Sequence, residues 1–426
     1  MPRHSYSSAE RFLLSREFFG MKLGLENITE FLESIGSPQN NYKTIHIAGT
    51  NGKGSTAAML ASILQSQGYK TGLFTSPHLV SLRERVAVNG KKIPRASVCS
   101  FVDRYRKILS QRQLSFFEVI TAMALYYFDK VKVDVAVIET GLGGRLDASN
   151  VLRPEITITT DISKDHMEIL GSSLSKIAFE KAGIIKPGVP HLIGMLPESA
   201  RNVMVKRCKI KNAPLHMLKK NEFKTYDTEN RLDFISYGFS LKNLKPQMYG
   251  SHQLRNSALV VKAAAILNEN GLKISKKAVR DGLASAFWPG RFQVIERKTK
   301  PTLVFDVCHN AGGVAVFVES FKNRFPEKRV HLITGVVKRK EHQKMFDLWG
   351  ELTECFHLVP LATHRSTDLD ELIGNINWRG HEVIRHKSLR AAYKKVLKNC
   401  DNDDIIIIVG SHYLVGEFFN KKIAYE

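Results

Sequence analysis

The stretch that decides the fold reads TIHIAGTNGKGST and spans residues 44–56. Residues 44–48 are typical of a short buried strand, and residues 55–67, closed by Gly68, of the helix that follows. The glycine-rich turn between them would present backbone N–H groups and the positive end of the helix dipole to a bound anion. This unit therefore predicts a phosphate-binding site in an α/β protein.

Three side chains of this turn suit a nucleoside triphosphate. Lys53 can reach the outer phosphates, and Ser55 or Thr56 can offer a hydroxyl group to Mg²⁺. The spacing differs from the common P-loop, because only two residues separate the first two glycines and Gly54 follows the lysine. An ordinary glycine-rich turn with a solvated lysine is the alternative, but the strand before it and the helix after it favour nucleotide binding.

Further strands continue the α/β alternation outward from this unit. Apolar runs at residues 70–75, 133–139 and 155–160 are separated by helical patterns, which predicts a mostly parallel sheet with helices on both faces. Residues 201–245 are polar, basic and rich in turns. We expect small strands there, on a surface flank of the first domain, followed by a helix at residues 256–268.

A second α/β series begins after the Trp-Pro-Gly-Arg sequence at residues 288–291. Its strands are predicted at residues 302–305, 330–334, 356–361 and 404–409. The fold class is therefore α/β, with an N-terminal P-loop ATPase domain on a mostly parallel sheet and a smaller, Rossmann-like C-terminal domain. The predicted domains are residues 1–294 and 295–426.

Polar residues follow several of the predicted strands, where open parallel sheets bind their ligands. Ser76 follows the second strand, Glu139 ends the third, and His166 comes shortly after the fourth. Oxygen ligands and an imidazole suit Mg²⁺ that substrate phosphates also bind. A turn for Ser76, a helix cap for Glu139 and a structural role for His166 are the alternatives, but their shared location favours a metal site.

Lys181 lies on the apolar face of a predicted helix. Leu174, Ile177 and Ala178 share that face, and a serine and a glycine mark the two ends of the helix. Desolvation favours a neutral amine, which can add CO₂ to form a carbamate and so become a carboxylate-like metal ligand. Spacing alone favours the alternative, a lysine whose stem packs on apolar surface while its ammonium group reaches water.

The chain is strongly basic. Its 426 residues include 63 Lys and Arg against 41 Asp and Glu, a formal net charge of +22. Nucleic acid, a membrane surface and small anionic substrates are all compatible with such an excess. The longest aliphatic run, residues 405–409, is far too short to span a membrane.

The start of the sequence and its cysteines bear on the compartment. The first residues, MPRHSYSSAERFLLSREFF, contain no sustained apolar stretch, so we expect no signal peptide. The five scattered cysteines, with no CxxC pair, favour reduced thiols over a disulfide or metal framework. The sequence therefore predicts a cytoplasmic protein.

Several motifs, in order from about residue 19 to residue 416, resemble one family: folylpolyglutamate synthase and dihydrofolate synthase, within the Mur ligase superfamily. They are HIAGTNGKGST (46–56), FTSPHL (74–79), ERVAVNG (84–90), FFEVITA (116–122), VIETGLGGRLDASNV (137–151), DHMEILG (165–171), EKAGIIKPG (180–188), HQLRNS (252–257), PGRFQVIE (289–296) and FDVCHN (305–310). The GLGGRLDASN block is highly specific. The resemblance implies ATP-dependent amide formation, in which ATP phosphorylates a carboxylate and the amine of L-glutamate then displaces the phosphate.

The resemblance also implies roles for particular residues. Those implied for ATP binding are Gly49, Asn51, Gly52, Lys53, Gly54, Ser55, Thr56, Asn256, Arg291 and Asp306. Those implied for two magnesium ions are Ser55, Ser76, Glu139 and His166. Lys181 resembles the carbamylated catalytic lysine (N6-carboxylysine) of the family. The resemblance thus favours a catalytic lysine over the lysine reaching into water that spacing alone favours. His309 resembles the catalytic histidine that approaches the phosphate from the second domain.

Three stretches are implied for the folate site. They are Met21, Lys22 and Leu23; Ser115, Phe116, Phe117 and Glu118; and Leu146, Asp147 and Ala148. In the C-terminal domain, residues 338–341 and 411–413 fall where the family has a lysine loop and a terminal strand motif, and the glutamate pocket is expected beside them. Some positions depart from the family: Lys22 stands where some bifunctional members carry Asp, Cys308 replaces a small residue, and Ala311 and Gly312 replace a proline.

The function expected from these residues is addition of L-glutamate to dihydropteroate, to reduced folates, or to both, with ATP and two Mg²⁺. Alternatives are folylpolyglutamate synthase activity alone, a Mur-type ligase for another amino-acid chain, and a basic nucleic-acid-binding NTPase. The LDASN and FFE stretches disfavour the Mur-type alternative, and the lack of an RNP or zinc-finger motif disfavours the NTPase. We expect no nucleic-acid or membrane partner, and the resemblance suggests a monomer.

Overall fold

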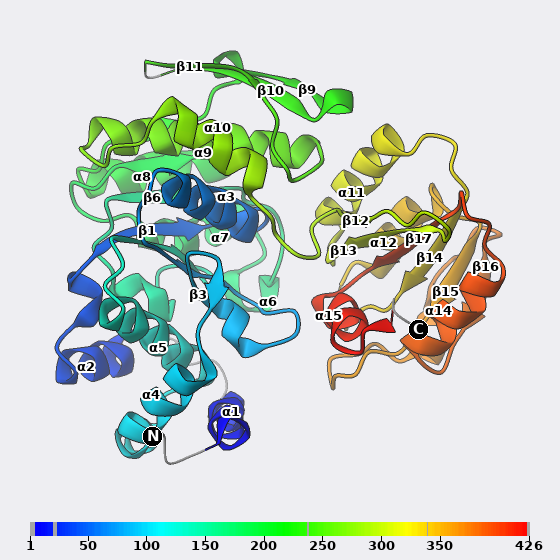
Figure 1. Cartoon of the computed structure of the whole chain (residues 1–426), viewed down its shortest axis with the longest axis horizontal. Coiled ribbons are helices and arrows are strands. Elements are labelled where there is room, and N and C mark those ends of the chain that lie inside the picture. Colours follow the sequence, from blue (N-terminus) through cyan, green and yellow to red (C-terminus); the bar gives the residue numbers. More distant parts are fainter. Residues whose placement is uncertain (1–4, 20–23, 237, 339, 424–426) are drawn as a thin grey trace.

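A computed structural model describes residues 5–19, 24–236, 238–338 and 340–423. Its two α/β parts lie side by side in Figure 1, with the N-terminal part on the left and the C-terminal part on the right. Each part is built around its own sheet, with helices on both faces. The expected α/β architecture is therefore confirmed.

The first sheet has eight strands in the order β4-β3-β2-β5-β1-β6-β7-β8. Their bounds are β1 Lys43–Ala48, β2 Thr71–Phe74, β3 Val86–Val88, β4 Lys91–Lys92, β5 Val135–Glu139, β6 Ile156–Thr159, β7 His191–Ile193 and β8 Leu215–Met217. Neighbouring strands in the stretch β2-β5-β1-β6-β7-β8 are parallel. Strand β3 pairs antiparallel with β2, and β4 pairs antiparallel with β3. The central strand β1 pairs Ile47 with Glu139 of β5 and Ala48 with Thr159 of β6, so these three strands end at one edge.

Helices cover both faces of this sheet, which explains why its strands are apolar throughout. Val135 and Val137 of β5 pack under one layer of helices, and Ala136 and Ile138 pack under the other. Figure 1 shows the first layer above the sheet and the second below it. The first layer is α3 Lys53–Ser66, α9 Ser251–Glu269 and α10 Lys276–Ser285; the second is α1 Tyr6–Ser15, α2 Glu26–Ser34, α4 Arg95–Gln111 and α5 Phe116–Lys130.

A third group of helices packs beside β7 and β8. It comprises α6 Met167–Leu170, α7 Leu174–Lys181 and α8 Glu198–Ile210. Short 3₁₀ turns connect the elements of this domain at Arg16–Phe19, Pro38–Asn40, Leu82–Arg85, Ala148–Val151, Ala182–Ile184, Lys220–Glu222 and Asp227–Glu229. The helix α7 carries Lys181 as its last residue, and Ser173 caps its start by accepting the Lys176 N–H.

The basic stretch 201–245 is only partly strand. Its start belongs to α8, because Ala200, Met204 and Cys208 recur at helical spacing and are buried. The strands expected there begin at β8, which joins the large sheet. Three more, β9 Phe223–Tyr226, β10 Arg231–Ser236 and β11 Phe239–Leu244, form a separate antiparallel sheet that packs against α9 and α10.

The second sheet has six strands in the order β12-β13-β17-β14-β15-β16. They are β12 Gln293–Ile295, β13 Thr302–Asp306, β14 Val330–Thr334, β15 Cys355–Leu358, β16 Glu382–Arg385 and β17 Ile405–Val409. Only β12 is antiparallel to its neighbour. The proposed division after residue 294 falls within β12.

Helices again cover both faces of this sheet. The core on one face includes residues of α11 Ala311–Arg324, α12 His342–Gly350 and α13 Leu369–Asn375, and the core on the other includes residues of α14 Leu389–Lys398 and α15 His412–Asn420. In the parts of the chain that the structure describes, no helix combines the length and apolar character that crossing a membrane requires.

Candidate active site

The glycine-rich loop joins β1 to α3 in a conformation that requires glycine. Gly49 and Gly52 have φ of +153° and +80°, in the region that L side chains rarely adopt. A Cβ atom at Gly49 would lie 2.0 Å from Thr160 Oγ1, and one at Gly54 would lie 2.9 Å from Trp288 Nε1. The loop is therefore a tight cradle at the start of α3, where the first backbone N–H groups have no acceptor within the helix.

The loop that follows β6 holds this cradle in place. The Thr50 backbone N–H donates to the Asp161 carbonyl at 2.8 Å, and Thr160 Oγ1 donates to the Asn51 carbonyl at 2.7 Å. The amide of Asn51 donates to Ser163 Oγ at 2.9 Å. The side chain of Asn51, expected to serve ATP, thus also ties the cradle to the next strand end.

The hydroxyl groups at the start of α3 are buried. Ser55 Oγ accepts from Gln253 Nε2 of α9 at 3.1 Å, and Lys53 Nζ lies 3.3 Å from the Thr50 carbonyl. Thr56 Oγ1 is buried without a protein partner. A glycine cradle, a nearby lysine and buried hydroxyl groups fit the phosphates of a nucleotide. Gln253 lies in the HQLRNS motif, but nothing in its local sequence distinguished it as a site residue.

Ser76 and Glu139 meet at the ends of β2 and β5. The Ser76 backbone N–H donates to Glu139 Oε2 at 3.1 Å. Burial raises the pKa of Glu139, while Lys53, the Ser76 N–H, Arg291 and Arg85 act in the opposite direction. A buried carboxylate beside the lysine of the phosphate loop fits a magnesium ligand.

His166 lies with a different group of charges. It precedes α6 as the N-cap residue with φ +49°, and its side chain is 45% exposed. Burial of the ring lowers its pKa, and the charges that also act on it are those of Asp165, Lys340, Glu168 and His309. The neutral imidazole is available as a ligand, and these neighbours place it near the junction of the two domains. Its place in a metal site with Glu139 stays a prediction.

Lys181 reaches the phosphate loop from α7. Its Nζ donates to the Gly49 carbonyl at 2.7 Å, and the residue is 4% exposed. Burial, followed by the charge of Lys53, lowers the pKa of Lys181 to about 7, although Asp165, Asp161 and Asp147 oppose the shift. The prediction that Lys181 lies on the apolar face of its helix is confirmed, since Ile177 and Ala178 are also buried.

Asp165 connects the two domains. It accepts from Lys340 Nζ at 2.6 Å and lies 3.7 Å from His309 Nε2. Burial opposes ionisation, but the nearby His309 and the hydrogen-bonded Lys340 outweigh it and hold the pKa of Asp165 well below its usual range. Asn310 Nδ2 adds contacts to Asn51 Oδ1 at 3.3 Å and to Asp165 Oδ2 at 3.4 Å. Residues of the FDVCHN motif and of the predicted lysine loop thus face the phosphate cradle.

The remaining residues expected to bind ATP line the same region. A Cβ atom at Gly52 would lie 2.9 Å from Asn256 Oδ1, so Asn256 packs directly on the cradle. Asp306 accepts from the Phe292 N–H at 2.8 Å and from the Cys308 N–H at 2.7 Å. Burial raises the pKa of Asp306, and the Arg291 charge opposes that shift.

The stretches expected to bind folate have structural contacts of their own. Ser115 caps α5, and Glu118 Oε2 accepts from both its N–H and its hydroxyl group, at 2.8 and 2.7 Å. Phe117 packs so closely on Gly141 that a Cβ there would lie 2.4 Å from its ring. Asp147 accepts from the Leu142 N–H at 2.8 Å and caps the turn after it.

Three of the residues expected in the folate site, Met21, Lys22 and Leu23, fall outside the described residues. Of the others, Phe116 and Ala148 are buried and Leu146 is partly exposed. A role for these stretches in substrate binding stays a prediction.

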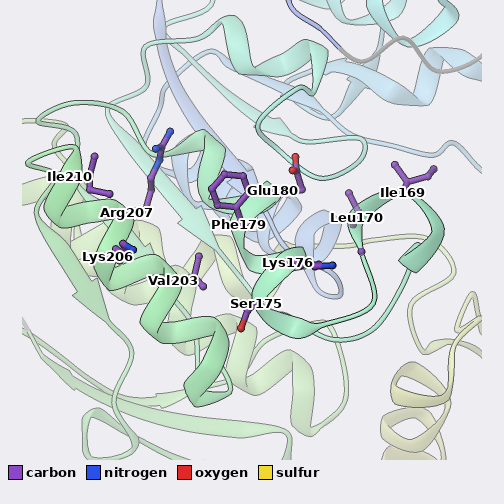
Figure 2. Close-up of a pocket in the computed structure, with 11 residues that line it drawn as sticks. Ile169, Leu170, Ser175, Lys176, Phe179, Glu180, Val203, Lys206, Arg207 and Ile210 are labelled. Carbon is purple, nitrogen blue, oxygen red and sulfur yellow. The ribbon is translucent and has the colours of Figure 1, made fainter.

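A separate groove lies between α7 and α8, shown in Figure 2. Phe179, Val203 and Ile210 give it an apolar wall, and Lys206 and Arg207 add positive charge. Its lining includes none of the residues expected to bind ATP or metal. It is therefore distinct from the site at the strand ends, although Glu180, at its rim, forms an ion pair with Arg145 of the GLGGRLDASN block at 3.0 Å.

Comparison with known proteins identifies the family. The Mur ligase middle domain matches residues 47–264, and the Mur ligase glutamate ligase domain matches residues 290–412. A Bacillus subtilis protein named dihydrofolate synthase/folylpolyglutamate synthase is 33% identical over 97% of this chain and 98% of its own length. The chain belongs to the folylpolyglutamate synthase/dihydrofolate synthase family of Mur ligases.

Other members of this family differ in their named activities. The Escherichia coli dihydrofolate synthase/folylpolyglutamate synthase is 29% identical over 92% of this chain and 90% of its own length. A Lacticaseibacillus casei protein named folylpolyglutamate synthase is 31% identical over 91% of both chains.

Solved structures of the family share the whole fold. Folylpolyglutamate synthase from Thermotoga maritima is 32% identical with a TM-score of 0.84, over 98% of this chain and 97% of that chain. Escherichia coli FolC in complex with DHPP and ADP is 28% identical with a TM-score of 0.86, over 100% and 99%. The Yersinia pestis bifunctional enzyme complexed with AMPPNP and Mn is 26% identical with a TM-score of 0.87, over 99% of both chains.

Proposed function

We propose that this protein is an ATP-dependent carbon–nitrogen ligase that adds L-glutamate to dihydropteroate, to reduced folates, or to both. The observation that carries the proposal is the convergence of the glycine cradle, Lys53, Glu139 and Lys181 at the ends of β1, β5 and α7. Family members of nearly the same length carry both activities in their names.

The reaction needs positioning and neutralisation of charge more than a protein nucleophile. ATP would phosphorylate the substrate carboxylate, and the glutamate amine would then attack the acyl phosphate. The cradle N–H groups and Lys53 would hold the phosphates, while Asn256, Arg291 and Asp306 would contact the rest of the nucleotide. His309 would approach the transferred phosphate from the second domain, since it already lies against Asp165.

Ser55, Ser76, Glu139 and His166 are the residues that would hold two magnesium ions. When bound, Mg²⁺ neutralises charge on the phosphate and carboxylate oxygens. A relative binds a nucleotide analogue together with manganese, which supports a divalent ion at this site. Carbamylation of Lys181 would add a second carboxylate-like group beside Glu139, and burial of its amine favours the neutral form that reacts with CO₂.

Dihydropteroate and reduced folates are proposed as acceptors because relatives are named dihydrofolate synthase/folylpolyglutamate synthase. The alternative is folylpolyglutamate synthase activity alone, as in the name of the Lacticaseibacillus casei relative. We also propose that the protein acts as a cytoplasmic monomer. Its five cysteines, all within the described residues, are free.

The experiment is a comparison of acceptors. Purified protein is incubated with ATP, Mg²⁺ and labelled L-glutamate, first with dihydropteroate and then with tetrahydrofolate. Incorporation into both supports the bifunctional enzyme, and incorporation into tetrahydrofolate alone supports the alternative. ATP hydrolysis driven by a different acceptor, with no incorporation into either compound, would refute the proposed substrates.

A further inference from the structure

The second domain contains a group of metal-ligating side chains that the proposed reaction does not use. His331, Cys400 and Asp404 each offer one ligand atom, and these atoms all lie within 4.8 Å of one another. His331 lies on β14, Asp404 directly precedes β17, and Cys400 lies in the turn after α14. Two neighbouring parallel strands and one turn therefore direct an imidazole, a thiol and a carboxylate toward one point.

The polar contacts of this group are well defined. His331 Nε2 lies 3.1 Å from Asp404 Oδ2, and the same oxygen accepts the Asp401 backbone N–H at 3.0 Å. The side chains of His331 and Asp404 are only 12% and 7% exposed. Arg329 lies 3.8 Å from the same carboxylate oxygen, but its side chain is 65% exposed and can move into solvent when a cation binds.

The spacing suits a small tetrahedral ion. Ligand atoms at about 2.0–2.3 Å from a zinc ion stand about 3.3–3.8 Å apart. The distance between His331 and Asp404 is already close to that range. No two of the three ligand atoms are more than 4.8 Å apart, which exceeds the upper end of that range by about 1 Å.

The group lies at the edge of the sheet opposite the candidate active site. His331 and Asp404 lie at the amino ends of β14 and β17, whereas His309 and Ser411 follow the carboxyl ends of β13 and β17. A strand of five residues is about 16 Å long. An ion held here therefore has no access to the reacting phosphate, and it would join β14 to the turn between α14 and β17.

Further nitrogen and sulfur donors lie on the same face of the sheet. His357 Nδ1 is 2.9 Å from His386 Nε2, and His357 Nε2 is 3.9 Å from Cys355 Sγ. The register of β14 and β15 pairs Ile333 with His357, so His331 and His357 point to the same side. Cys355 provides a second thiol close by, which makes it a matched control for Cys400.

We propose that His331, Cys400 and Asp404 bind one divalent transition-metal ion of the Zn²⁺ class, with water as the fourth ligand. Zinc accepts this mixture of nitrogen, sulfur and oxygen ligands. Mg²⁺ and Ca²⁺ prefer oxygen ligands alone, so the thiol distinguishes this site from the proposed magnesium site. The proposal does not depend on the ligase reaction.

The test is a titration of the full chain with Co²⁺ in excess Mg²⁺, which fills oxygen-rich sites. We expect a near-ultraviolet band from thiolate-to-cobalt charge transfer that saturates at one ion per chain. C400S should abolish the band, and H331Q or D404N should weaken cobalt binding by at least about tenfold. C355S and C308S, which remove thiols outside the proposed ligand set, should leave the band unchanged.

Absence of the band in the natural protein, or its persistence in C400S, would overturn the proposal, as would its loss in C308S. Circular dichroism establishes whether C400S is folded. X-ray absorption of the Zn²⁺-loaded natural protein provides an independent measurement, in which one sulfur ligand at about 2.3 Å is expected. A shell of nitrogen and oxygen alone would contradict the site.

Discussion

Lys181 Nζ donates a hydrogen bond to the carbonyl oxygen of Gly49 over 2.7 Å, which joins the end of α7 to the first residue of the phosphate loop. Burial and the nearby Lys53 lower the pKa of this amine to about 7. The lysine that we propose to become carbamylated therefore also helps to position the cradle. We therefore expect the charge state of Lys181 to affect stability and, under the proposed carbamate role, activity as well.

The stability of the protein should increase with pH because of Lys181. The unfolded chain keeps this lysine protonated up to about pH 10.4, whereas the folded protein releases the proton near pH 7. The unfolded state thus binds more protons between these values, and the free energy of unfolding rises through this window. Between pH 7 and 9 the contribution of Lys181 amounts to about 2 kcal/mol.

Denaturant melts of the natural protein and K181M at pH 7 and pH 9, without Mg²⁺ or bicarbonate, measure this contribution. The difference in unfolding free energy between the two proteins should change by about 2 kcal/mol in favour of the natural protein at the higher pH. An equal pH dependence in both would show that Lys181 stays protonated in the fold.

Turnover should depend on the Lys181 side chain. K181A should lose at least about a hundredfold in kcat because it removes the group proposed to become a carboxylate-like ligand beside the phosphates. Small carboxylates added in solution should restore part of the activity. K176A, on the exposed side of the same helix, is the control and should retain it. Full activity in K181A would eliminate the carbamate role.

Glu139 should be required for metal-dependent turnover but not for folding. Burial raises the pKa of Glu139, so the ionised carboxylate is costly in the protein alone and E139Q should be at least as stable as the natural chain at pH 7. The same variant should lose at least about a hundredfold in kcat and its response to Mg²⁺.

E155Q is a matched control for E139Q. Glu155 precedes β6, near the opposite edge of the sheet, and its contact with Lys43 at 3.7 Å is partly exposed. E155Q should change neither kcat nor the magnesium dependence. Unchanged activity in E139Q would remove Glu139 from the proposed metal site.

The contact between Asp165 and Lys340 should control how the two domains meet. D165N and K340A should each raise the KM for ATP or lower kcat, because each leaves the other partner of a partly buried ion pair without its counter-charge. The exposed Lys328, in the loop before β14 at the opposite edge of the second sheet, provides the control K328A. Small-angle scattering with and without ATP would show whether the loss of activity follows a change in domain arrangement.

Local patterns were sufficient to predict much of the fold. The strand β1, the turn and α3 follow from a buried apolar run, glycines and helical periodicity, and the buried face of α7 follows from spacing alone. Short strands were missed because they are too brief or polar to carry a pattern, as in β4, Lys91–Lys92. The helix α8 was misread since its basic surface outweighed three buried residues.

The contacts between domains could not be predicted from the sequence alone. Asp165 and Lys340 are separated by 175 positions, and Gln253 reaches Ser55 across 198. No local periodicity encodes such pairs; only the relative position of the two sheets and of α9 brings them together. The expected convergence of Glu139 and His166 is likewise a tertiary property, and it stays a prediction.

The most direct test of the account is incorporation of labelled L-glutamate in the presence of ATP and Mg²⁺. Dihydropteroate and tetrahydrofolate are each offered as the acceptor, and the natural protein is compared with K181A. The account predicts a glutamylated product with at least one acceptor, release of one ADP per amide bond, and a rate at least about a hundredfold lower with K181A. ADP release that depends on another acceptor, with neither compound gaining glutamate, would contradict it.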